Sequence, residues 1–305
     1  MSIAAAQGSN LLIIDPFVPV DQIVESYPFL SPIQVIDSVK ADIPTIFVLL
    51  RNLNYFILEL PHIVQHGSLF KSNGCFSSRH ILSHRCFFAD QPQNVSSSTT
   101  ATISFNEKRI IHASHPNFIA VYIYHDVINI IPINNEHSKR KQKSYIINLL
   151  QPNVVNMAFL GPTSCSARIA FIADSSNASR TLVVYKYSEA SDDFVYEFEF
   201  ELPPDSYYII PIHPELQSTL AVIASDGIIR VTAPEGLPYT AERLSSFMPP
   251  IIIHACHFFD DIYLLCDACG GLSGMRLPVE GPIATENCKI VGPTSGIVSS
   301  DPNHF

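Results

Sequence analysis

Residues 220–233, LAVIASDGIIRVTA, decide the fold of this chain. Two short apolar runs, Leu220–Ala224 and Ile228–Ala233, flank the polar triplet 225–227. Strands favour β-branched residues such as Ile and Val, and an Asp-Gly pair supplies the positive-φ backbone of a tight turn. The stretch therefore predicts two antiparallel strands joined by a short turn.

The same arrangement of two apolar runs around a turn occurs four more times. The pairs are Ile46–Leu50 with Tyr55–Leu60, Ala120–Tyr124 with Val127–Ile133, Ile169–Ala173 with Leu182–Tyr187, and Ile262–Cys266 with Leu272–Leu277. From residue 126 onward the turns recur at intervals of 44 to 51 residues. Units of about 40–50 residues with four short strands each are typical of the blades of a β-propeller. A β-sandwich would explain the strands but not the repeat.

The clearest single strand is Phe194–Leu202, FVYEFEFEL. Strict alternation predicts that its acidic and apolar side chains lie on opposite faces: Glu197, Glu199 and Glu201 against Tyr196, Phe198, Phe200 and Leu202. No segment shows sustained helical periodicity with capping residues at its ends. We therefore expect an all-β protein.

The repeat predicts an incomplete β-propeller with about five full blades plus fragments. We expect N-terminally shortened first blades in residues 1–66, a Ser-rich insertion of low order in 67–102, the remaining blades in 103–295 and a divergent tail in 296–305. The fragments are Leu11–Asp15 before the five blades and one strand, Cys288–Val291, after them. Because ring closure removes free strand edges, we expect a chain with these limits to associate at micromolar concentration.

The composition favours a folded protein and disfavours several functional classes. Hydrophobic residues make up 47% of the 305 residues and charged residues 15%, the opposite of the balance in disordered chains. A net charge of −10 argues against a general binder of phosphate backbones. No apolar stretch is long enough to predict a membrane span. The seven cysteines have no regular spacing, which indicates reduced thiols in a cytosolic or nuclear protein.

One group of Cys and His side chains has the composition of a zinc site, and a zinc-dependent enzyme is therefore one hypothesis. The group is His254, Cys256, His257, Cys266 and Cys269, in which Cys266-Asp-Ala-Cys269 has zinc-knuckle spacing. Two strands with small buried thiols are the simpler interpretation, because alternation sends neighbouring side chains to opposite faces. We therefore predict no metal and no cofactor here.

Two other groups of residues lie in predicted loops. Cys75, His80, His84 and Cys86 lie in the insertion, where His80 and His84 would share a face only in a helix. The basic cluster Lys139-Arg140-Lys141-Gln142-Lys143 could be a nuclear-localisation or nucleic-acid patch, although a solvated hairpin loop is the ordinary interpretation. We predict no metal site in the first group and treat nucleic-acid contact by the second as a hypothesis.

No known catalytic motif occurs in the sequence. It contains no nucleotide-binding glycine loop, nucleophile elbow or zinc-protease helix motif. The glycine-rich stretch 270–274 is explained by a turn between strands. We predict no catalytic or cofactor-binding residue, and no enzyme activity.

Several stretches resemble the first propeller of a known family. These are Ile119–Ile133 with the following Tyr145–Phe159, Pro249–Ile251, Leu264–Leu272, which matches the pattern Leu-Leu-x-Asp-x-x-Gly, and Gly292–Ser295. The family includes damage-specific DNA-binding protein 1, the large subunit of the cleavage and polyadenylation specificity factor, and the third subunit of splicing factor 3b. The similarity is weak over 10–65 and fairly continuous over 105–296. His125-Asp126 and Cys266 depart from the family's usual Asp-Gly turn and glycine.

The resemblance implies a propeller of the seven-bladed type, incomplete here, and a non-catalytic interaction scaffold, closest to damage-specific DNA-binding protein 1. That relative is a three-propeller adaptor of cullin–RING ubiquitin ligases and acts in DNA repair. The implied partners are substrate receptors, cullin ligase components and further propellers of the same protein, without a membrane. The implied location is the nucleus, with the cytoplasm as a second compartment. The alternative is a scaffold subunit of an mRNA 3′-end processing or splicing complex that binds nucleic acid.

Overall fold

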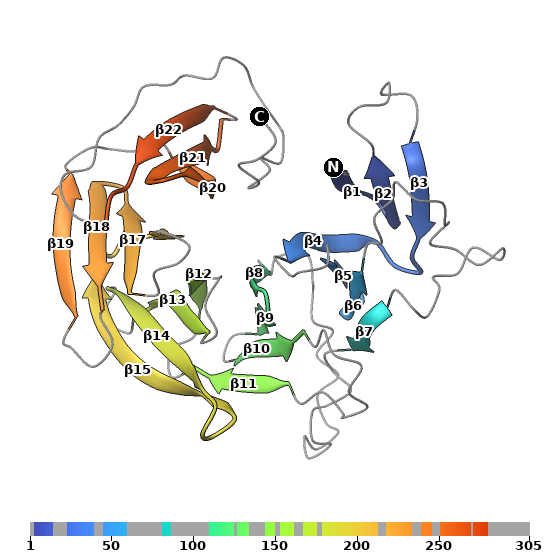
Figure 1. The fold of residues 1–305 in the computed structure, drawn as a ribbon, viewed down its shortest axis with the longest axis horizontal. Coiled ribbons are helices and arrows are strands. Elements are labelled where there is room, and N and C mark those ends of the chain that lie inside the picture. The colour runs from blue at the N-terminus through green and yellow to red at the C-terminus, as the bar shows by residue number, and fades with distance from the viewer. Residues whose placement is uncertain are drawn as a thin grey trace. The chain divides into compact units, whose positions relative to one another are not determined.

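The computed structural model describes fourteen segments of the chain. They are residues 3–14, 23–39, 45–59, 81–86, 110–124, 127–133, 144–149, 153–161, 167–175, 179–212, 218–233, 239–245, 251–269 and 271–279. Within them, 22 β-strands form six sheets, and no helix occurs (Figure 1). This part of the chain therefore contains no helix with the length and apolarity needed to cross a bilayer.

The sheets are built from strands that follow one another in the sequence. The first has the order β1-β2-β3 and the second β4-β5-β6-β7. Their strands are β1 (Ile3–Gln7), β2 (Asn10–Ile14), β3 (Ile23–Pro28), β4 (Ile33–Val39), β5 (Thr45–Leu50), β6 (Asn54–Glu59) and β7 (Ile81–Cys86). The third sheet has the order β11-β10-β9-β8 and contains β8 (Ile111–His115), β9 (Phe118–Tyr124), β10 (Val127–Pro132) and β11 (Tyr145–Asn148).

Three more sheets complete the described chain, with orders β12-β13-β14-β15, β16-β17-β18-β19 and β20-β21-β22. The first of them contains β12 (Val154–Leu160), β13 (Arg168–Asp174), β14 (Arg180–Ser188) and β15 (Asp193–Leu202). The second contains β16 (Tyr208–Pro211), β17 (Thr219–Ala224), β18 (Gly227–Thr232) and β19 (Thr240–Ser245). The third contains β20 (Ile252–Phe259), β21 (Ile262–Asp267) and β22 (Leu272–Arg276).

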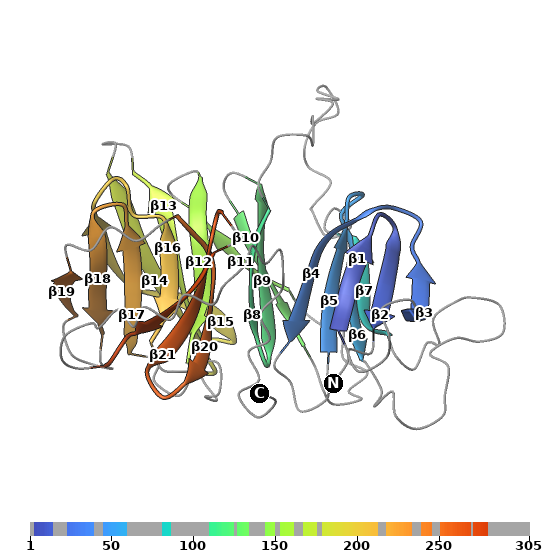
Figure 2. The same ribbon diagram turned by 90° about the horizontal axis from the view of Figure 1, so that it is seen from above.

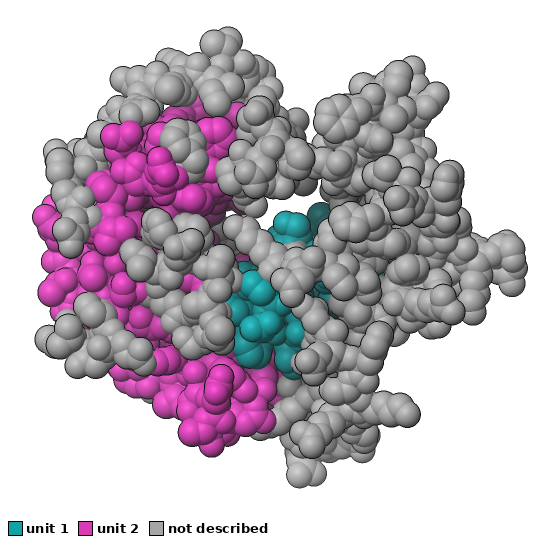
Figure 3. Space-filling model, viewed as in Figure 1, with its two compact units in different colours: residues 1–110, 114–119, 131–143 teal, residues 111–113, 120–130, 144–305 magenta. Residues whose placement is uncertain are grey.

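The chain divides into two compact units (Figure 3). Unit 1 comprises residues 1–110, 114–119 and 131–143, and it contains β1–β7. Unit 2 comprises residues 111–113, 120–130 and 144–305, and it contains β11–β22. Within unit 2, the three sheets from β12 to β22 follow one another in chain order (Figures 1 and 2).

The predicted all-β, propeller-type fold is confirmed. Five blade-like sheets, β4–β7, β8–β11, β12–β15, β16–β19 and β20–β22, each contain one of the five predicted hairpins. In the deciding stretch, β17 and β18 pair from Thr219↔Thr232 to Ala224↔Gly227, so that Ser225 and Asp226 form the turn. The expected strand 288–291, the tail 296–305 and the basic cluster 139–143 lie outside the described residues.

Strand β17 shows why the deciding stretch is continuously apolar. Every one of its six residues is buried. Leu220 and Val222 pack in a core cluster with Leu182 and Val184 of β14, while Ile223 packs in a second cluster with residues of β21. A strand covered on both faces favours apolar side chains, and β17 has a polar one only at its first residue, Thr219. Each large aliphatic residue buried there contributes about 1.5–3 kcal/mol.

The structure contains more strand than the sequence predicts near its N-terminal end. The expected fragment Leu11–Asp15 is part of a three-stranded sheet over Ile3–Pro28. Within the expected insertion 67–102, Ile81–Cys86 form β7, which pairs with β6 and completes a four-stranded sheet. The strands that the sequence missed, β1, β3 and β7, carry weak patterns because each is an edge strand, which pairs on one side only and needs no regular apolar alternation.

The predicted alternation along β15 is wrong at one point. A β-bulge interrupts the pairing with β14, so that Val184 lies opposite Phe198 and Tyr185 lies opposite Tyr196, with Glu197 as the extra residue. Phe198 consequently packs against the core cluster that contains Val184, whereas Tyr196 contacts the ring of Tyr185. One inserted residue exchanges the two faces of a strand, and a regular sequence pattern does not reveal it.

Candidate interaction surface

Two buried arginines in unit 2 form hydrogen bonds between consecutive sheets, one from the β12–β15 sheet to the β16–β19 sheet and one from the β16–β19 sheet to the β20–β22 sheet. Arg168, at the start of β13, donates from Nε and Nη2 to Oε2 of Glu197 at 2.8 Å each, and from Nη1 to the Ala233 carbonyl at 3.1 Å. Its side chain is 4% exposed, while that of Glu197 is 25% exposed. Ala233 follows β18 of the next sheet. The planar guanidinium therefore satisfies an acid in its own sheet and a carbonyl in its neighbour.

Arg230 of β18 repeats this arrangement one sheet later. Its Nη2 lies 2.7 Å from Oε2 of Glu242 on β19, and its Nη1 donates to the Pro278 carbonyl at 3.1 Å. Pro278 follows β22 of the next sheet. In both cases an arginine binds a carboxylate of its own sheet and a backbone carbonyl of the next sheet. The repetition indicates that these bonds fix the spacing between the three sheets.

Tyrosine hydroxyls add further bonds between the last two sheets. The backbone N–H groups of Ile252 and Ala255 donate to the hydroxyls of Tyr207 and Tyr208, each at 3.1 Å. The hydroxyl of Tyr263 donates to the Pro211 carbonyl at 2.8 Å. Burial raises the pKa of Tyr208 to about 12, so this side chain stays neutral and polar across the physiological range.

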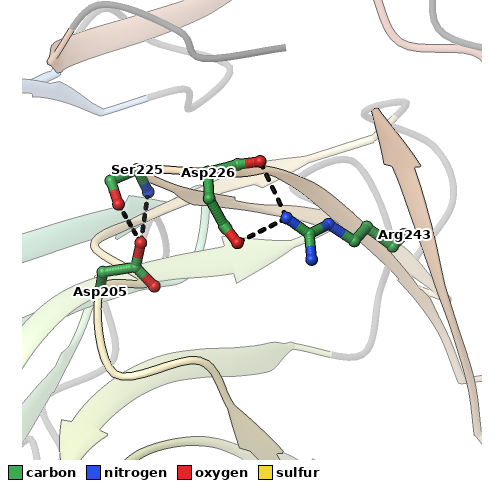
Figure 4. Close-up of polar contacts among 4 residues, drawn as sticks. All are labelled: Asp205, Ser225, Asp226 and Arg243. Carbon is green, nitrogen blue, oxygen red and sulfur yellow. Dashed lines mark hydrogen bonds and ion pairs between the residues drawn. The ribbon is translucent and has the colours of Figure 1, made fainter. Parts of the chain in front are cut away.

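An exposed polar cluster covers one end of the β16–β19 sheet (Figure 4). Asp205, in the turn before β16, accepts from the backbone N–H of Ser225 at 3.1 Å and from its hydroxyl. Asp226 accepts from Nη2 of Arg243 on β19, which also reaches the Asp226 carbonyl at 2.9 Å. The hydrogen bond from the Ser225 hydroxyl lowers the pKa of Asp205. The cluster fixes two turns and presents charged side chains to solvent.

The outer edge of the β12–β15 sheet exposes aromatic and acidic side chains on both faces of β15, with Tyr196, Glu199 and Glu201 on one face and Val195 and the neighbouring Tyr239 on the other. We define the outer-edge surface as Val195, Tyr196, Glu199, Glu201 and Tyr239, all of which are exposed. Tyr239 precedes β19 and stacks on Phe198 with ring centroids 5.2 Å apart. Tyr196 is 50% exposed and Tyr239 40% exposed. The coulombic effect of Glu199 adds to burial in raising the pKa of Tyr196.

The structure brings together only part of the first group of candidate metal ligands, the cross-strand pair His254 and Cys266. His254 pairs with Cys266 and Cys256 with Leu264, whereas His257 pairs with Tyr263 and lies against its ring at 5.2 Å. His257 therefore lies on the opposite face of the sheet from its neighbour Cys256. Cys266 is buried and Cys269 is exposed in the following turn. The Cys266–Cys269 spacing belongs to a strand end and a turn.

The second group lies largely beyond what the structure describes. Cys75 and His80 fall outside the described residues, and His84 and Cys86 lie on β7, not on a helix. Across the fourteen described segments, no group of three or more His, Cys, Asp or Glu side chains is placed to hold a metal ion.

The Leu-Leu-x-Asp-x-x-Gly stretch has a structural explanation in Asp267. Oδ1 of Asp267 accepts from the backbone N–H groups of Cys269 and Gly271, each at 2.8 Å. A Cβ atom at position 271 would lie 2.6 Å from Oδ2 of Asp267. The turn between β21 and β22 therefore requires an acceptor at 267, the Asp of that pattern, and a glycine at 271, one residue after the glycine of the pattern.

A family model described as the RSE1/DDB1/CPSF1 first beta-propeller matches residues 82–292, more than two thirds of the chain. The chain belongs to the RSE1/DDB1/CPSF1 family. The match contains all of β8–β22, and with them both interblade arginines and the whole outer-edge surface. No curated protein shows significant similarity to the chain.

Propellers of the RSE1/DDB1/CPSF1 family generally serve as protein-interaction scaffolds. The described geometry agrees with such a role, because its polar groups either join neighbouring sheets or lie on exposed turns and edges. The sequence interpretation missed Arg168, Glu197 and Arg230. An arginine within an apolar strand, as in IIRVT, was the one available signal, since a buried cation requires a partner.

Proposed function

We propose that the chain is a non-catalytic scaffold of the damage-specific DNA-binding protein 1 type, an adaptor in cullin–RING ubiquitin ligases that act in ubiquitination and DNA repair. The observation that carries the proposal is the family match over residues 82–292. The choice of this branch of the family rests on the resemblance of Ile119–Ile133 and Leu264–Leu272 to that protein. The proposed location is the nucleus, with the cytoplasm as a second compartment.

The interblade bonds of Arg168 and Arg230 support a scaffold role. A scaffold must present its binding loops at fixed spacing, and loops on a rigid framework lose less entropy when a partner binds. The interblade and tyrosine hydrogen bonds of unit 2 described above serve this framework. The proposed partners are substrate receptors and cullin ligase components.

Affinity purification of the full-length gene product from separated nuclear and cytoplasmic extracts tests this proposal. We expect cullin and propeller-type substrate receptors in the nuclear eluate, at levels well above those recovered with an unrelated tagged propeller. Recovery of pre-mRNA processing factors without cullin would overturn the adaptor assignment. Recovery from the cytoplasmic extract alone would overturn the nuclear one.

A second candidate is a scaffold subunit of an mRNA 3′-end processing or splicing complex. The observation that favours it is the basic cluster Lys139, Arg140, Lys141 and Lys143, which gathers 4 of the 18 basic residues within five positions. Ultraviolet crosslinking to RNA that is lost when all four are changed to Gln would support it. The matched control changes Arg51 and Arg276 to Gln, which should leave crosslinking intact.

A further inference from the structure

The outer-edge surface is an unusual part of the described chain because it combines exposed apolar and acidic groups. Of the seven exposed large hydrophobic residues in the described segments, three, Val195, Tyr196 and Tyr239, lie on it. Most exposed apolar residues of a soluble protein are scattered singly, whereas a cluster rimmed by polar groups marks an interaction site. The surface therefore needs an explanation beyond the packing of the fold.

In the part of the chain that the structure describes, the carboxylates of this surface form no ion pair. Across the strand pair, Glu199 lies opposite Val183 and Glu201 lies opposite Thr181. The cations of β14, Arg180 and Lys186, lie opposite Leu202 and Val195. Neither Glu199 nor Glu201 forms an ion pair with a described residue, in contrast to Glu197, which Arg168 holds. Two like charges two residues apart therefore remain available to a partner.

Strand β15 also offers an extended backbone. It is the longest of the described strands, with ten residues, and the last in its sheet, so one edge faces away from β14. The bulge at Glu197 and the acidic residues disfavour pairing with another copy of the same strand, because like charges would meet. A basic segment meets no such repulsion.

We propose that the outer-edge surface binds an extended, arginine-rich segment of a partner protein. Guanidinium groups pair with Glu199 and Glu201 and stack on Tyr196, which lies on the same face of β15, while the intervening side chains of the segment meet Val195 and Tyr239 on the other face. Arginine fits better than lysine because its planar, weakly hydrated cation both stacks on aromatic rings and pairs with carboxylates. This inference goes beyond the proposed function, because it is independent of the assembly in which the scaffold acts.

Titration of the whole chain with a fluorescent peptide of alternating arginine and serine tests the proposal, with an alternating lysine–serine peptide as comparison. We expect the arginine peptide to bind more tightly and to lose affinity as salt is raised. The Glu199→Gln/Glu201→Gln variant should weaken binding by about three- to tenfold. The control Glu189→Gln/Asp260→Asn removes the same charge from exposed turns elsewhere and should change binding by less than about twofold.

Four results would overturn the proposal. They are failure of the arginine peptide to bind, equal binding of the lysine peptide, equal weakening by the control variant, and self-association of the chain that the Glu199→Gln/Glu201→Gln change strengthens. The last result would identify the occupant as a second copy of the chain. Circular dichroism of each variant shows whether the fold is retained, and because the four positions are partly or fully exposed, we expect it to be.

Discussion

The guanidinium of Arg168 reaches past β14 to bind Glu197 on β15, with Nε and Nη2 both 2.8 Å from Oε2. Arg168 lies opposite Lys186 on β14, and Lys186 lies opposite Val195 on β15. Glu197 follows Val195 by two residues and is the extra residue of the β-bulge. The bulge at Glu197 is what brings its carboxylate within reach. A local irregularity of an outer strand therefore neutralises a charge that is buried at the start of β13.

Arg168→Lys should lower the free energy of unfolding by about 2–3 kcal/mol. A single ammonium cannot satisfy both Glu197 and the Ala233 carbonyl, so one buried acceptor is left without its donor. Urea denaturation measures the change. The control Arg276→Lys alters an exposed pair with Asp261 and should cost less than about 0.5 kcal/mol. Equal costs for the two variants would contradict the importance of the interblade bond.

His115 should make stability depend on pH in a window between about 4 and 6.5. Burial lowers the pKa of His115 to about 4, and the Asn117 N–H donates to its Nδ1 at 3.1 Å, so the folded chain holds a neutral ring. The unfolded chain takes up a proton near pH 6.5. The stabilising contribution is thus complete above pH 6.5 and is lost as the pH falls, by an amount on the order of 3 kcal/mol at pH 4.

The His115→Asn variant tests this pH dependence, because its amide oxygen can accept the same N–H without titrating. The difference in unfolding free energy between wild type and variant should change steadily between pH 6.5 and pH 4. A difference that stays constant over that range would show that His115 does not titrate as described.

Gly271→Ala should destabilise the chain by about 1–3 kcal/mol, since the new methyl group would meet Oδ2 of Asp267 at 2.6 Å. The carboxylate cannot move away without losing two backbone N–H donors. In an Asp267→Ala background the same glycine substitution should cost clearly less. Thermal unfolding of the four proteins gives the coupling energy, and a coupling near zero would mean that the clash is relieved in another way.

Replacement of Asp192 by Asn should change the stability little, whereas replacement by Ala should destabilise the fold. Its φ is 47°, and its Oδ1 accepts from the hydroxyls of Tyr145 at 2.7 Å and Tyr187 at 2.9 Å. Asn adopts this backbone readily and retains an acceptor, so Asp192→Asn should cost less than about 1 kcal/mol. Asp192→Ala should cost about 2–4 kcal/mol, because it strains the backbone and removes both bonds. Equal costs in chemical denaturation would contradict this assignment.

The hairpins could be predicted because each is encoded locally. In β17 and β18, apolar runs end at Ser225 and Asp226, and this local pattern indicates the turn, which Asp205 and Arg243 stabilise further in the folded chain. The same local encoding explains why a turn could be predicted at Gly271, within the glycine-rich stretch 270–274. Repetition of such signals at near-constant spacing was sufficient to predict the blades.

The remaining features depend on contacts between distant residues. Nothing near Arg168 in the sequence indicates Glu197, 29 residues away, or the Ala233 carbonyl, 65 residues away. The bulge that brings Glu197 within reach is absent from the regular pattern of β15. The five candidate ligands around Cys266 look like a site in one dimension, yet alternation across two strands separates His257 from Cys256. A sequence window shows proximity along the chain, whereas the site requires proximity in space.

The direction of the interblade arginine bonds has a consequence for synthesis on the ribosome. In both cases the arginine belongs to the earlier sheet and the carbonyl to the later one, 65 residues downstream for Arg168 and 48 for Arg230. At about 5–20 residues per second, the Ala233 carbonyl is made about 3–13 s after Arg168. After Leu202 is made and until Ala233 follows, the nascent β12–β15 sheet has all its strands but lacks one acceptor for a buried cation. Each of these two sheets therefore gains its interblade arginine bond only when the next sheet has been made. A translational pause between residues 202 and 233 would prolong the time during which chaperones and proteases can act on the emerging chain.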